Sequence, residues 1–172
     1  MEFEAIIDEH KDAVYHFCCH LTRNKVDADD LFQDTWLKAF EKLHKYDDTY
    51  AMKNWLYTIA VNTYKDRYRK SSLALKRFIQ FSSSKDQDQH IANVQTNTGI
   101  PLTHLIEKEK HDSVKEAVKE LPDKFRLPII LYYFKEVDQQ TIAKILGVPL
   151  GTVKSRLNTG KTKLKQRLEG DR

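Results

Sequence analysis

The residues from 150 to 168 combine positive charge with small polar side chains, a mixture suited to reading the edges of DNA bases. This segment contains six basic residues and no acidic one: Lys154, Arg156, Lys161, Lys163, Lys165 and Arg167. On a helical wheel, small and polar residues share one side: Gly151, Lys154, Ser155, Asn158 and Thr162. Groove-reading helices hydrogen-bond to base edges and place cations near phosphates, so the segment predicts a DNA-recognition helix.

A second candidate surface combines cations with tyrosines between residues 46 and 70. One exposed side of a helix expected over 54–70 collects Thr58, Asn62, Lys65 and Arg69. Five tyrosines lie in or beside this helix: Tyr46, Tyr50, Tyr57, Tyr64 and Tyr68. Aromatic rings stack on unpaired bases while cations follow the backbone, so the pattern is typical of single-stranded nucleic-acid binding.

The spacing of small and apolar residues between 141 and 157 predicts a helix-turn-helix. Ala143 is small where two helices cross, and Gly147 supplies the left-handed turn four residues later. Val153, six residues further on, packs the second helix onto the first. An apolar frame completes this small core: Ile142, Leu146, Val148 and Leu157. Asp138 is the expected N-cap of the first helix.

Helices are expected to position both surfaces, because the chain has only 5 Gly and 4 Pro and lacks clean apolar–polar alternation. Apolar residues recur at helical spacing from Phe3 to Leu21. After a turn, with Asp27 as expected N-cap, a second helix carries five apolar residues: Leu31, Phe32, Trp36, Phe40 and Leu43. The predicted fold class is all-α, with two small helical domains over 1–72 and 104–172. A polar, flexible linker over 73–103 joins them, with a short helical continuation expected over 75–81.

Composition and charge exclude several classes of protein. The 172 residues are 40% hydrophobic and 31% charged, unlike a disordered or membrane-embedded chain. The first residues lack the order of a secretory signal, and the adjacent Cys18 and Cys19 cannot form a disulfide framework, so we expect a cytoplasmic protein. Residues 1–34 hold 3 basic and 9 acidic side chains, which indicates a protein partner for this third of the chain.

Three other interpretations of these residues stay open. The helix-turn-helix could belong to a regulator that binds duplex DNA by itself, or be an αα-hairpin with a solvated outer face. His16 and His20 lie four residues apart near Cys18 and Cys19, so a zinc site is conceivable, although Cys18 does not share the histidines' face. No Gly-rich phosphate loop, nucleophile elbow or HExxH motif is present. We therefore expect no enzyme, no catalytic residue, no metal and no cofactor.

Three motifs resemble bacterial sigma factors of the extracytoplasmic-function (ECF) group of the sigma-70 family. Residues 29–39 (DDLFQDTWLKA) are similar to the family's polymerase-docking helix, and residues 55–62 (WLYTIAVN) to its helix for the promoter −10 element. Residues 121–126 (LPDKFR) and 151–157 (GTVKSRL) are similar to the beginning and the end of its −35-reading domain. The resemblance covers nearly the whole chain outside the linker.

The resemblance implies an alternative sigma factor that binds core RNA polymerase, directs promoter-specific initiation and assists strand opening. The residues implied to bind polymerase are Asp30, Leu31, Gln33, Asp34 and Leu37. Those implied to contact the −10 element are Asp47, Tyr50, Lys53, Trp55, Asn62, Lys65 and Arg69, with the loop 47–53 holding a flipped base. Those implied to contact the −35 element are Thr152, Lys154, Ser155, Arg156, Asn158, Thr159 and Lys161.

The implied partners are the β′ clamp helices and β flap of the polymerase, promoter DNA and an anti-sigma factor that masks both domains. No small-molecule substrate is implied. The chain departs from the family after Leu157, where an aromatic residue or His is usually followed by Arg-Ala-Arg; residues 158–161 read NTGK instead. This change removes cations from the groove side and places the helix-weakening Gly160 on the core side.

Overall fold

The computed structural model describes the backbone of residues 2–82 and 113–170, and the side chains of residues 2–70 and 113–169. Besides a helix over 113–119, its elements are α1 (Phe3–Leu21), α2 (Lys25–Lys42), the 3₁₀ helix η1 (Leu43–Lys45), α3 (Met52–Ser82), α5 (Asp123–Ile129), the π-helical turn η2 (Ile130–Phe134), α6 (Gln139–Leu146) and α7 (Leu150–Gly170). Within these ranges there is no strand, which confirms the all-α prediction. The expected linker residues 83–103, and the first residues of the expected second domain, 104–112, lie outside the described part.

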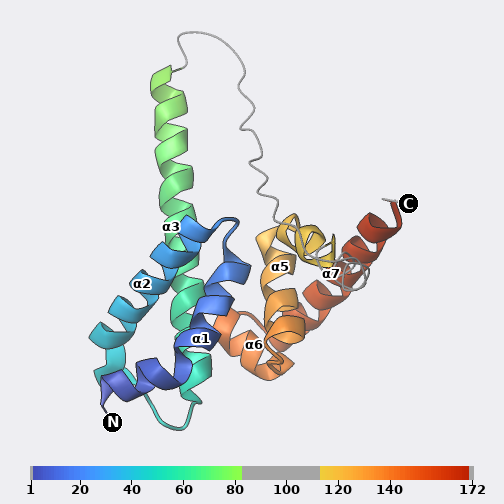
Figure 1. Cartoon of the computed structure of the whole chain (residues 1–172). Coiled ribbons are helices and arrows are strands. Elements are labelled where there is room, and N and C mark those ends of the chain that lie inside the picture. The colour runs from blue at the N-terminus through green and yellow to red at the C-terminus, as the bar shows by residue number, and fades with distance from the viewer. Residues whose placement is uncertain (1, 83–112, 171–172) are drawn as a thin grey trace, which may run out of the picture.

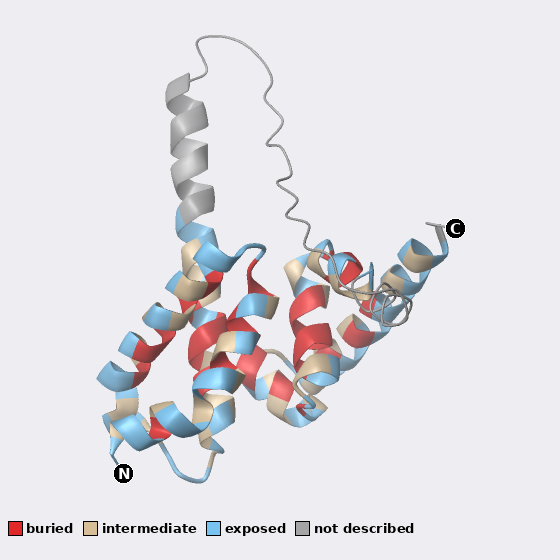
Figure 2. Ribbon diagram, viewed as in Figure 1, coloured by how far each residue is buried: buried red, intermediate tan, exposed pale blue. Residues whose placement is uncertain are grey.

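Helices α1, α2 and α3 form an N-terminal three-helix bundle (Figure 1). Their buried faces meet along the middle of the bundle, as the red ribbon segments in Figure 2 show. Phe17 and Tyr57 are fully buried there, with ring centroids 4.4 Å apart. The helical spacing recognised from Phe3 to Leu21 is thus the spacing of a core-facing stripe. None of the helices described is long and apolar enough to cross a membrane.

The termini of α2 and α3 differ from the expected ones. Asn24, not Asp27, is the N-cap of α2: its side chain accepts a hydrogen bond from the Asp27 backbone N–H at 2.8 Å and donates one to the Asp27 carboxylate. Either residue type can cap a helix. Asn24 is the cap because its backbone is still extended (φ −140°, ψ 165°), whereas Asp27 already lies in the first turn of α2. The backbone of α3 continues to Ser82, so the short helix expected over 75–81 is the end of one long helix.

The C-terminal unit is built from α5, η2, α6 and α7. Pro128 lies inside α5, where it cannot donate a backbone hydrogen bond, and the helix then widens into the π-helical turn. Helix α7 packs against α5 along Gly160, which is buried as the helical wheel predicts. A Cβ at Gly160 would lie 3.1 Å from Cγ1 of Ile129, a side chain that is itself buried. The glycine therefore allows a close helix–helix approach.

The two units touch each other. Helix α3 packs against α6, so that the first helix of the predicted helix-turn-helix lies beside the helix carrying the cations and tyrosines (Figure 1). Buried residues of both units form one continuous hydrophobic cluster. This contact brings the α3 surface next to the end of α6.

Replacing Gly160 by Ala is expected to destabilise the protein. The gain in helix propensity, about 1 kcal/mol, is outweighed by crowding against Ile129, because overpacking a tight core costs about 1–3 kcal/mol. Gly151→Ala is the matched control, since a Cβ there meets nothing within 4 Å. Thermal unfolding should show a lower melting temperature for G160A and an unchanged or higher one for G151A. A stabilised G160A protein would show that Ile129 moves aside freely.

Candidate nucleic-acid interface

The helix-turn-helix forms through the contacts that its sequence predicts. The Asp138 carboxylate caps α6 by accepting hydrogen bonds from the Thr141 backbone N–H at 2.9 Å and the Thr141 hydroxyl at 2.6 Å. These bonds lower the pKa of the Asp138 carboxyl. Gly147 ends the helix at φ 65°, in the left-handed region, and the Val148 N–H then bonds to the Ala143 carbonyl. The turn is therefore fixed by its own backbone.

Helix α7 presents the face expected to read DNA. Val153 and Leu157 are buried against α6 and the rest of the unit, which aims the opposite side of α7 outward. Five of the seven expected −35 residues are exposed: Lys154, Ser155, Asn158, Thr159 and Lys161. Thr152 and Arg156 are half-buried. Side chains able to donate and accept hydrogen bonds thus line an accessible helix face, as groove recognition requires.

Two tyrosines beside this face escaped the sequence analysis. Tyr132 and Tyr133 are exposed, pack edge to face with ring centroids 4.9 Å apart, and border a hollow of about 310 Å³. Lys154, Asn158 and Lys161 line the same hollow. Three aromatic residues occur in a row at 132–134, and a helix cannot turn all of them toward its core. That signal was available in the sequence and was not used.

The loop before α3 is held in place by its own hydrogen bonds. The Asp47 carboxylate accepts a bond from the Thr49 N–H at 2.9 Å, which lowers the pKa of Asp47. The Tyr46 hydroxyl donates to the Tyr50 carbonyl at 2.6 Å, and the Tyr46 ring packs edge-on against Trp55. The expected −10 residues of the loop, Asp47, Tyr50 and Lys53, are therefore carried on a fixed scaffold.

The tyrosines of this region have different roles. Tyr57 is fully buried and belongs to the bundle core, and burial raises its pKa to about 12. Tyr46, Tyr50 and Tyr64 are half-buried, whereas Tyr68 is 63% exposed. A period-based argument could not separate these cases, because whether a ring is covered depends on which helix packs over it.

Four of the expected −10 residues on α3 are exposed: Lys53, Asn62, Lys65 and Arg69. Of these, Lys65 also reaches the C-terminal unit, where its ammonium donates a hydrogen bond to the Leu146 carbonyl, at the end of α6, at 3.3 Å. Burial, and secondly the charge of Arg156, lower the pKa of Lys65. The structure thus brings an expected −10 residue next to an expected −35 residue.

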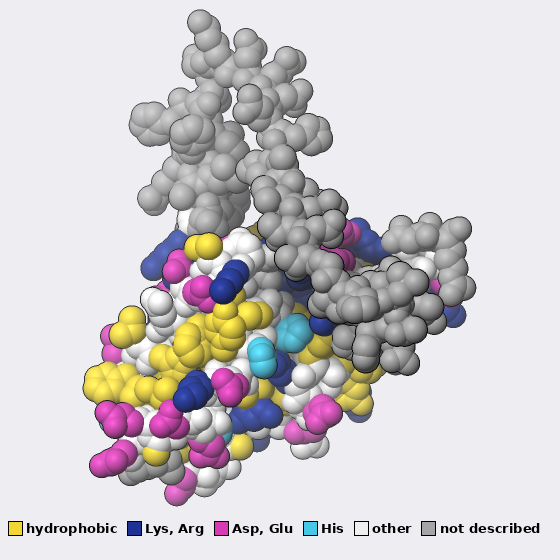
Figure 3. Space-filling view, viewed as in Figure 1, with side chains coloured by type: hydrophobic (Ala, Val, Ile, Leu, Met, Phe, Trp, Pro, Cys, Tyr) yellow, Lys and Arg dark blue, Asp and Glu magenta, His cyan; other side chains and the backbone are white. Residues whose placement is uncertain are grey.

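Helix α2 exposes an apolar surface close to its C-terminal end. Leu37 is 63% exposed and Phe40 is 64% exposed. Figure 3 shows a band of hydrophobic side chains across the N-terminal bundle, with acidic side chains gathered at its lower end. Such exposed apolar patches mark protein-binding surfaces more often than chance.

The four other residues expected to bind polymerase differ in their surroundings. Gln33 is exposed, but Leu31 is 1% exposed and packs inside the bundle, so it has no surface to offer a partner. The Asp34 carboxylate accepts a 2.8 Å bond from Arg67 of α3. Asp30 lies 3.6 Å from the same guanidinium. The two acids therefore also hold α2 against α3, as half-exposed ion pairs of modest strength.

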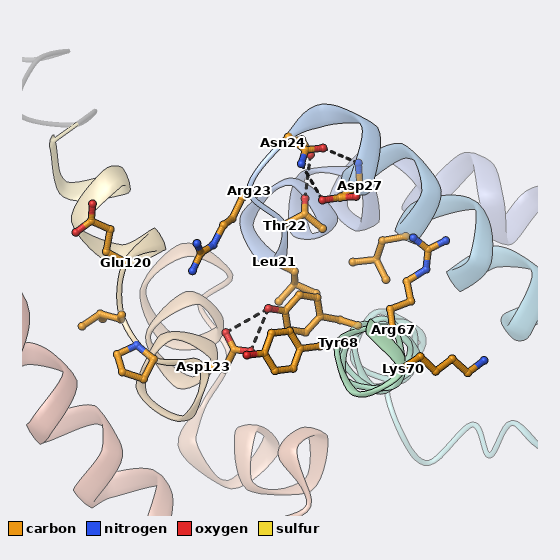
Figure 4. A pocket seen from close by; sticks show the side chains of 14 residues that line it. Leu21, Thr22, Arg23, Asn24, Asp27, Arg67, Tyr68, Lys70, Glu120 and Asp123 are labelled. Carbon is orange, nitrogen blue, oxygen red and sulfur yellow. Dashed lines mark hydrogen bonds between the residues drawn. The ribbon is translucent and has the colours of Figure 1, made fainter. Parts of the chain in front are cut away.

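A cavity of about 990 Å³ lies between the α1–α2 turn, α3 and the start of α5 (Figure 4). Arg23, Arg67 and Lys70 reach its rim from the N-terminal bundle, and Glu120 and Asp123 from the C-terminal unit. Its wall contains charges of both signs. The cavity is therefore a junction between the two units and lacks the uniform charge of an anion-binding pocket.

The conceivable zinc site does not assemble. Cys18 is fully buried, and burial raises its pKa to about 12, which keeps the sulfur protonated and a poor metal ligand. Cys19 and His16 are exposed. Among the described residues, no three His, Cys, Asp or Glu side chains come close enough to hold a metal ion.

Comparison with known proteins identifies the family. Residues 6–73 match the family model described as Sigma-70 region 2, and residues 111–164 match Sigma-70, region 4. The chain belongs to the sigma-70 family, in its ECF group, and is an alternative sigma factor that directs promoter-specific transcription. Sigma factors bind core RNA polymerase and promoter DNA and are not enzymes. A regulator with only a helix-turn-helix would not account for the match to region 2.

Individual relatives are similar to this chain over almost its full length. The ECF sigma factor SigW of Bacillus subtilis is 28% identical over 166 residues, which cover 96% of this chain and 88% of SigW. SigM of the same organism is 29% identical over 169 residues, or 96% and 94% of the two chains. The sigma factor RpoE of Bartonella quintana, solved in complex with the anti-sigma factor NepR, superposes with a TM-score of 0.71 at 26% identity, over 99% and 98% of the chains.

The stability of the protein is expected to fall as the pH drops below 6.5. His20 packs against Phe134 with ring centroids 4.8 Å apart, and burial, then Lys135, lower its pKa from 6.5 to about 4. Between pH 6.5 and about 4, His20 is protonated in the unfolded chain but neutral in the folded chain. Lowering the pH through this range therefore favours unfolding.

His20→Leu should remove this dependence, because leucine keeps the apolar contact with Phe134 and does not titrate. Melting temperatures measured between pH 6.5 and about 5, where carboxylates change little, provide the test. His16→Gln, one turn earlier and exposed, is the control and should keep the slope of the wild-type protein. If the melting temperature of H20L depends on pH as steeply as that of the wild-type protein, groups other than His20 cause the dependence.

Proposed function

We propose that the three surfaces divide the work of this sigma factor: α2 docks on core polymerase, the loop 47–53 with α3 holds the melted −10 strand, and α7 reads the −35 element. The observation that carries this assignment is the outward face of α7, where polar and cationic side chains stand free of the core. Each surface also lies within a segment that matches the family.

For polymerase docking, the apolar patch on α2 supports Leu37 as a contact and adds Phe40, with Asp30, Gln33 and Asp34 beside them. A clamp surface made of helices would cover these side chains and remove them from water. Leu31 then acts from inside the bundle, by fixing the orientation of α2. The acidic balance of residues 1–34 favours a basic partner surface around the apolar contact.

For strand opening, the fixed loop supports a pocket for a flipped base. A protein without a nucleotide motor must offset the cost of unstacking, a few kcal/mol per base, by binding the extruded base. Asp47, Tyr50 and Lys53 are the loop residues proposed to bind it. Trp55 packs against the Tyr46 ring, and the Tyr46 hydroxyl in turn holds the loop at the Tyr50 carbonyl. Asn62, Lys65 and Arg69 would follow the strand along α3.

For duplex recognition, Lys154, Ser155, Asn158 and Thr159 are proposed to face the −35 major groove. Thr152, Arg156 and Lys161 flank them toward the phosphates. Because the hollow beside Lys154 and Lys161 is bordered by Tyr132 and Tyr133, we add these two tyrosines to the DNA-facing surface. Asn158 stands where the family usually has an aromatic residue or His, and Thr159 where it usually has Arg, so both positions carry neutral hydrogen-bonding groups.

The partners follow from the family. Core polymerase, through its β′ clamp helices and β flap, and promoter DNA are the proposed working partners, and the protein acts in the cytoplasm, where both are found. An anti-sigma factor is proposed as a third partner, supported by the RpoE relative solved in complex with NepR. The chain itself is proposed to perform no catalytic step and to need no cofactor.

The proposal is tested by transcription with purified core polymerase, the full-length chain and genomic templates. Initiation from defined start sites, preceded by shared −35 and −10 sequences, is the expected result. Permanganate footprinting should show reactive thymines around the −10 element. Failure to direct initiation at any start site would refute the assignment.

Leu37→Glu is expected to weaken binding to core polymerase by at least tenfold, because burying a leucine contributes about 1.5–3 kcal/mol and the added charge must lose its water. Val26→Glu is the matched control: Val26 is also exposed on α2, at 71%, but lies near the opposite end of the helix. Polymerase affinity is measured by fluorescence anisotropy. Equal losses in both variants would mean that the whole helix, not the patch, forms the contact.

Lys154→Glu is expected to reduce open-complex formation about tenfold while leaving polymerase affinity unchanged, because the side chain lies on the DNA face only. Lys165→Glu makes the same charge change further along α7, where Lys165 lies 3.8 Å from Glu169. Its effect on a template with a −35 element should be small. Should K154E lose polymerase binding as well, the residue would have a structural role.

A further inference from the structure

The hollow of about 310 Å³ between η2 and the outward face of α7 has a mixed lining. The rings of Tyr132 and Tyr133 and the side chain of Leu157 provide apolar surface. The carboxamides of Asn158 and Gln139 provide hydrogen-bonding groups. Two lysines also border the hollow, and among the described residues no acidic side chain does. Such a lining suits the edge of a DNA base, which is uncharged but is carried on a polyanion.

The backbone next to Tyr132 and Tyr133 has an unusual conformation. In η2 the Lys135 N–H donates to the Ile130 carbonyl at 3.2 Å, one residue further back along the chain than in an α-helix. Glu136 follows in a left-handed conformation, with φ 54°, which is usually taken by glycine at the end of a helix. Strain of this kind persists only where the surrounding structure enforces it, and it clusters at binding sites. Both tyrosines are exposed beside this strained turn.

Asn158 is the residue of this lining whose hydrogen-bonding groups are still available on the face of α7. The Ser155 hydroxyl donates to the Thr152 backbone carbonyl at 3.0 Å. The Thr162 hydroxyl donates to the Asn158 backbone carbonyl at 3.1 Å. The Asn158 carboxamide is exposed and makes no hydrogen bond to any described residue. It can accept a bond from the N6 amino group of adenine while donating one to the adenine N7.

The hydrocarbon beside Asn158 narrows the choice of base pair to A·T. Thymine is the only base that brings a methyl group into the major groove. Tyr132, Tyr133 and Leu157 offer that methyl group an apolar surface in the same hollow as the carboxamide. A G·C pair has no such methyl group, and its guanine would place the O6 acceptor against the carboxamide oxygen.

We propose that this hollow is a subsite for one A·T pair of the −35 element: Asn158 reads the adenine, and the apolar surface of Tyr132, Tyr133 and Leu157 receives the thymine methyl group. The inference rests on the proposed −35 function of α7 and specifies what one part of that surface selects. Residue 158 is a position where the chain departs from the usual aromatic residue or His of its family, so this preference belongs to the chain itself.

Asn158→Ala tests the reading of adenine. The holoenzyme formed from core polymerase and the full-length chain is titrated with a promoter found by transcription of genomic templates, each −35 pair being replaced in turn. The wild-type holoenzyme should lose affinity about tenfold when one particular A·T pair becomes G·C. N158A should bind both templates equally and keep the wild-type preference at the other pairs. Gln166→Ala removes another exposed carboxamide about two turns further along α7, so this matched control should keep every preference.

Two altered bases at that A·T pair separate the two contacts. 7-Deazaadenine lacks the N7 acceptor but still pairs with thymine, so it should weaken binding of the wild-type holoenzyme severalfold and leave N158A unaffected. Uracil in place of thymine removes only the methyl group. It should weaken binding of the wild-type holoenzyme severalfold and leave the double variant Y132A/Y133A unaffected, because that variant has lost the apolar surface.

The outcomes separate this inference from the proposed function. If N158A keeps the wild-type preference at every −35 pair and both proteins direct initiation, the subsite is wrong and the proposed function stands. If the pair that N158A no longer distinguishes is G·C, the assignment to A·T is wrong. The altered bases decide even if a variant is unstable: equal binding of the wild-type holoenzyme with adenine and 7-deazaadenine at every −35 adenine would overturn the inference. Failure of the wild-type chain to direct any initiation would refute the proposed function itself.

Discussion

The junction between the two helical units depends on one buried positive charge. Arg126 is almost completely enclosed, and a guanidinium removed from water costs several kcal/mol unless it is paired and hydrogen-bonded. Asp123 provides the pairing from the same helix, and Tyr64 provides a further acceptor from α3. The Arg126 Nη1 atom has no hydrogen-bond partner among the described residues. Because Tyr64 supplies one of the hydrogen bonds of Arg126, contact with the bundle stabilises the C-terminal unit, and the need to pair this charge makes the contact specific.

Helix α3 packs against the rest of the bundle on one side and against α6 on another. Toward the bundle it buries Leu56, Tyr57 and Ala60, which fix the helix in place. Toward α6 it turns Lys65, one of the side chains expected to follow single-stranded DNA. A chain with a net charge of only +4 is expected to have little general attraction for DNA.

Local patterns predicted much of the fold and part of the candidate site. The cap at Asp138, the left-handed Gly147 and the inward Val153 all follow from residue types at fixed spacing, because the backbone of a helix-turn-helix sets those positions over a few residues. Errors arose where partners lie far apart in sequence. Phe40 has helical spacing and touches the Phe3 ring of α1, yet remains 64% exposed, whereas Leu31, implied to contact polymerase, is buried inside the bundle. Periodicity identifies a stripe; only packing shows how much of the stripe is covered.

The sequence by itself determined the helices and the polar, outward face of α7, since these depend on capping, helical period and residues close along the chain. The tertiary structure alone decided which tyrosines are core, that Asp30 and Asp34 face Arg67, and that α6 packs against α3 with its last carbonyl at Lys65. Those outcomes depend on side chains many residues apart, such as Tyr64 and Asp123, whose approach no local pattern encodes. The chemistry of each surface depends on residues close together in the sequence, whereas its accessibility depends on elements that are distant in the sequence and pack against it.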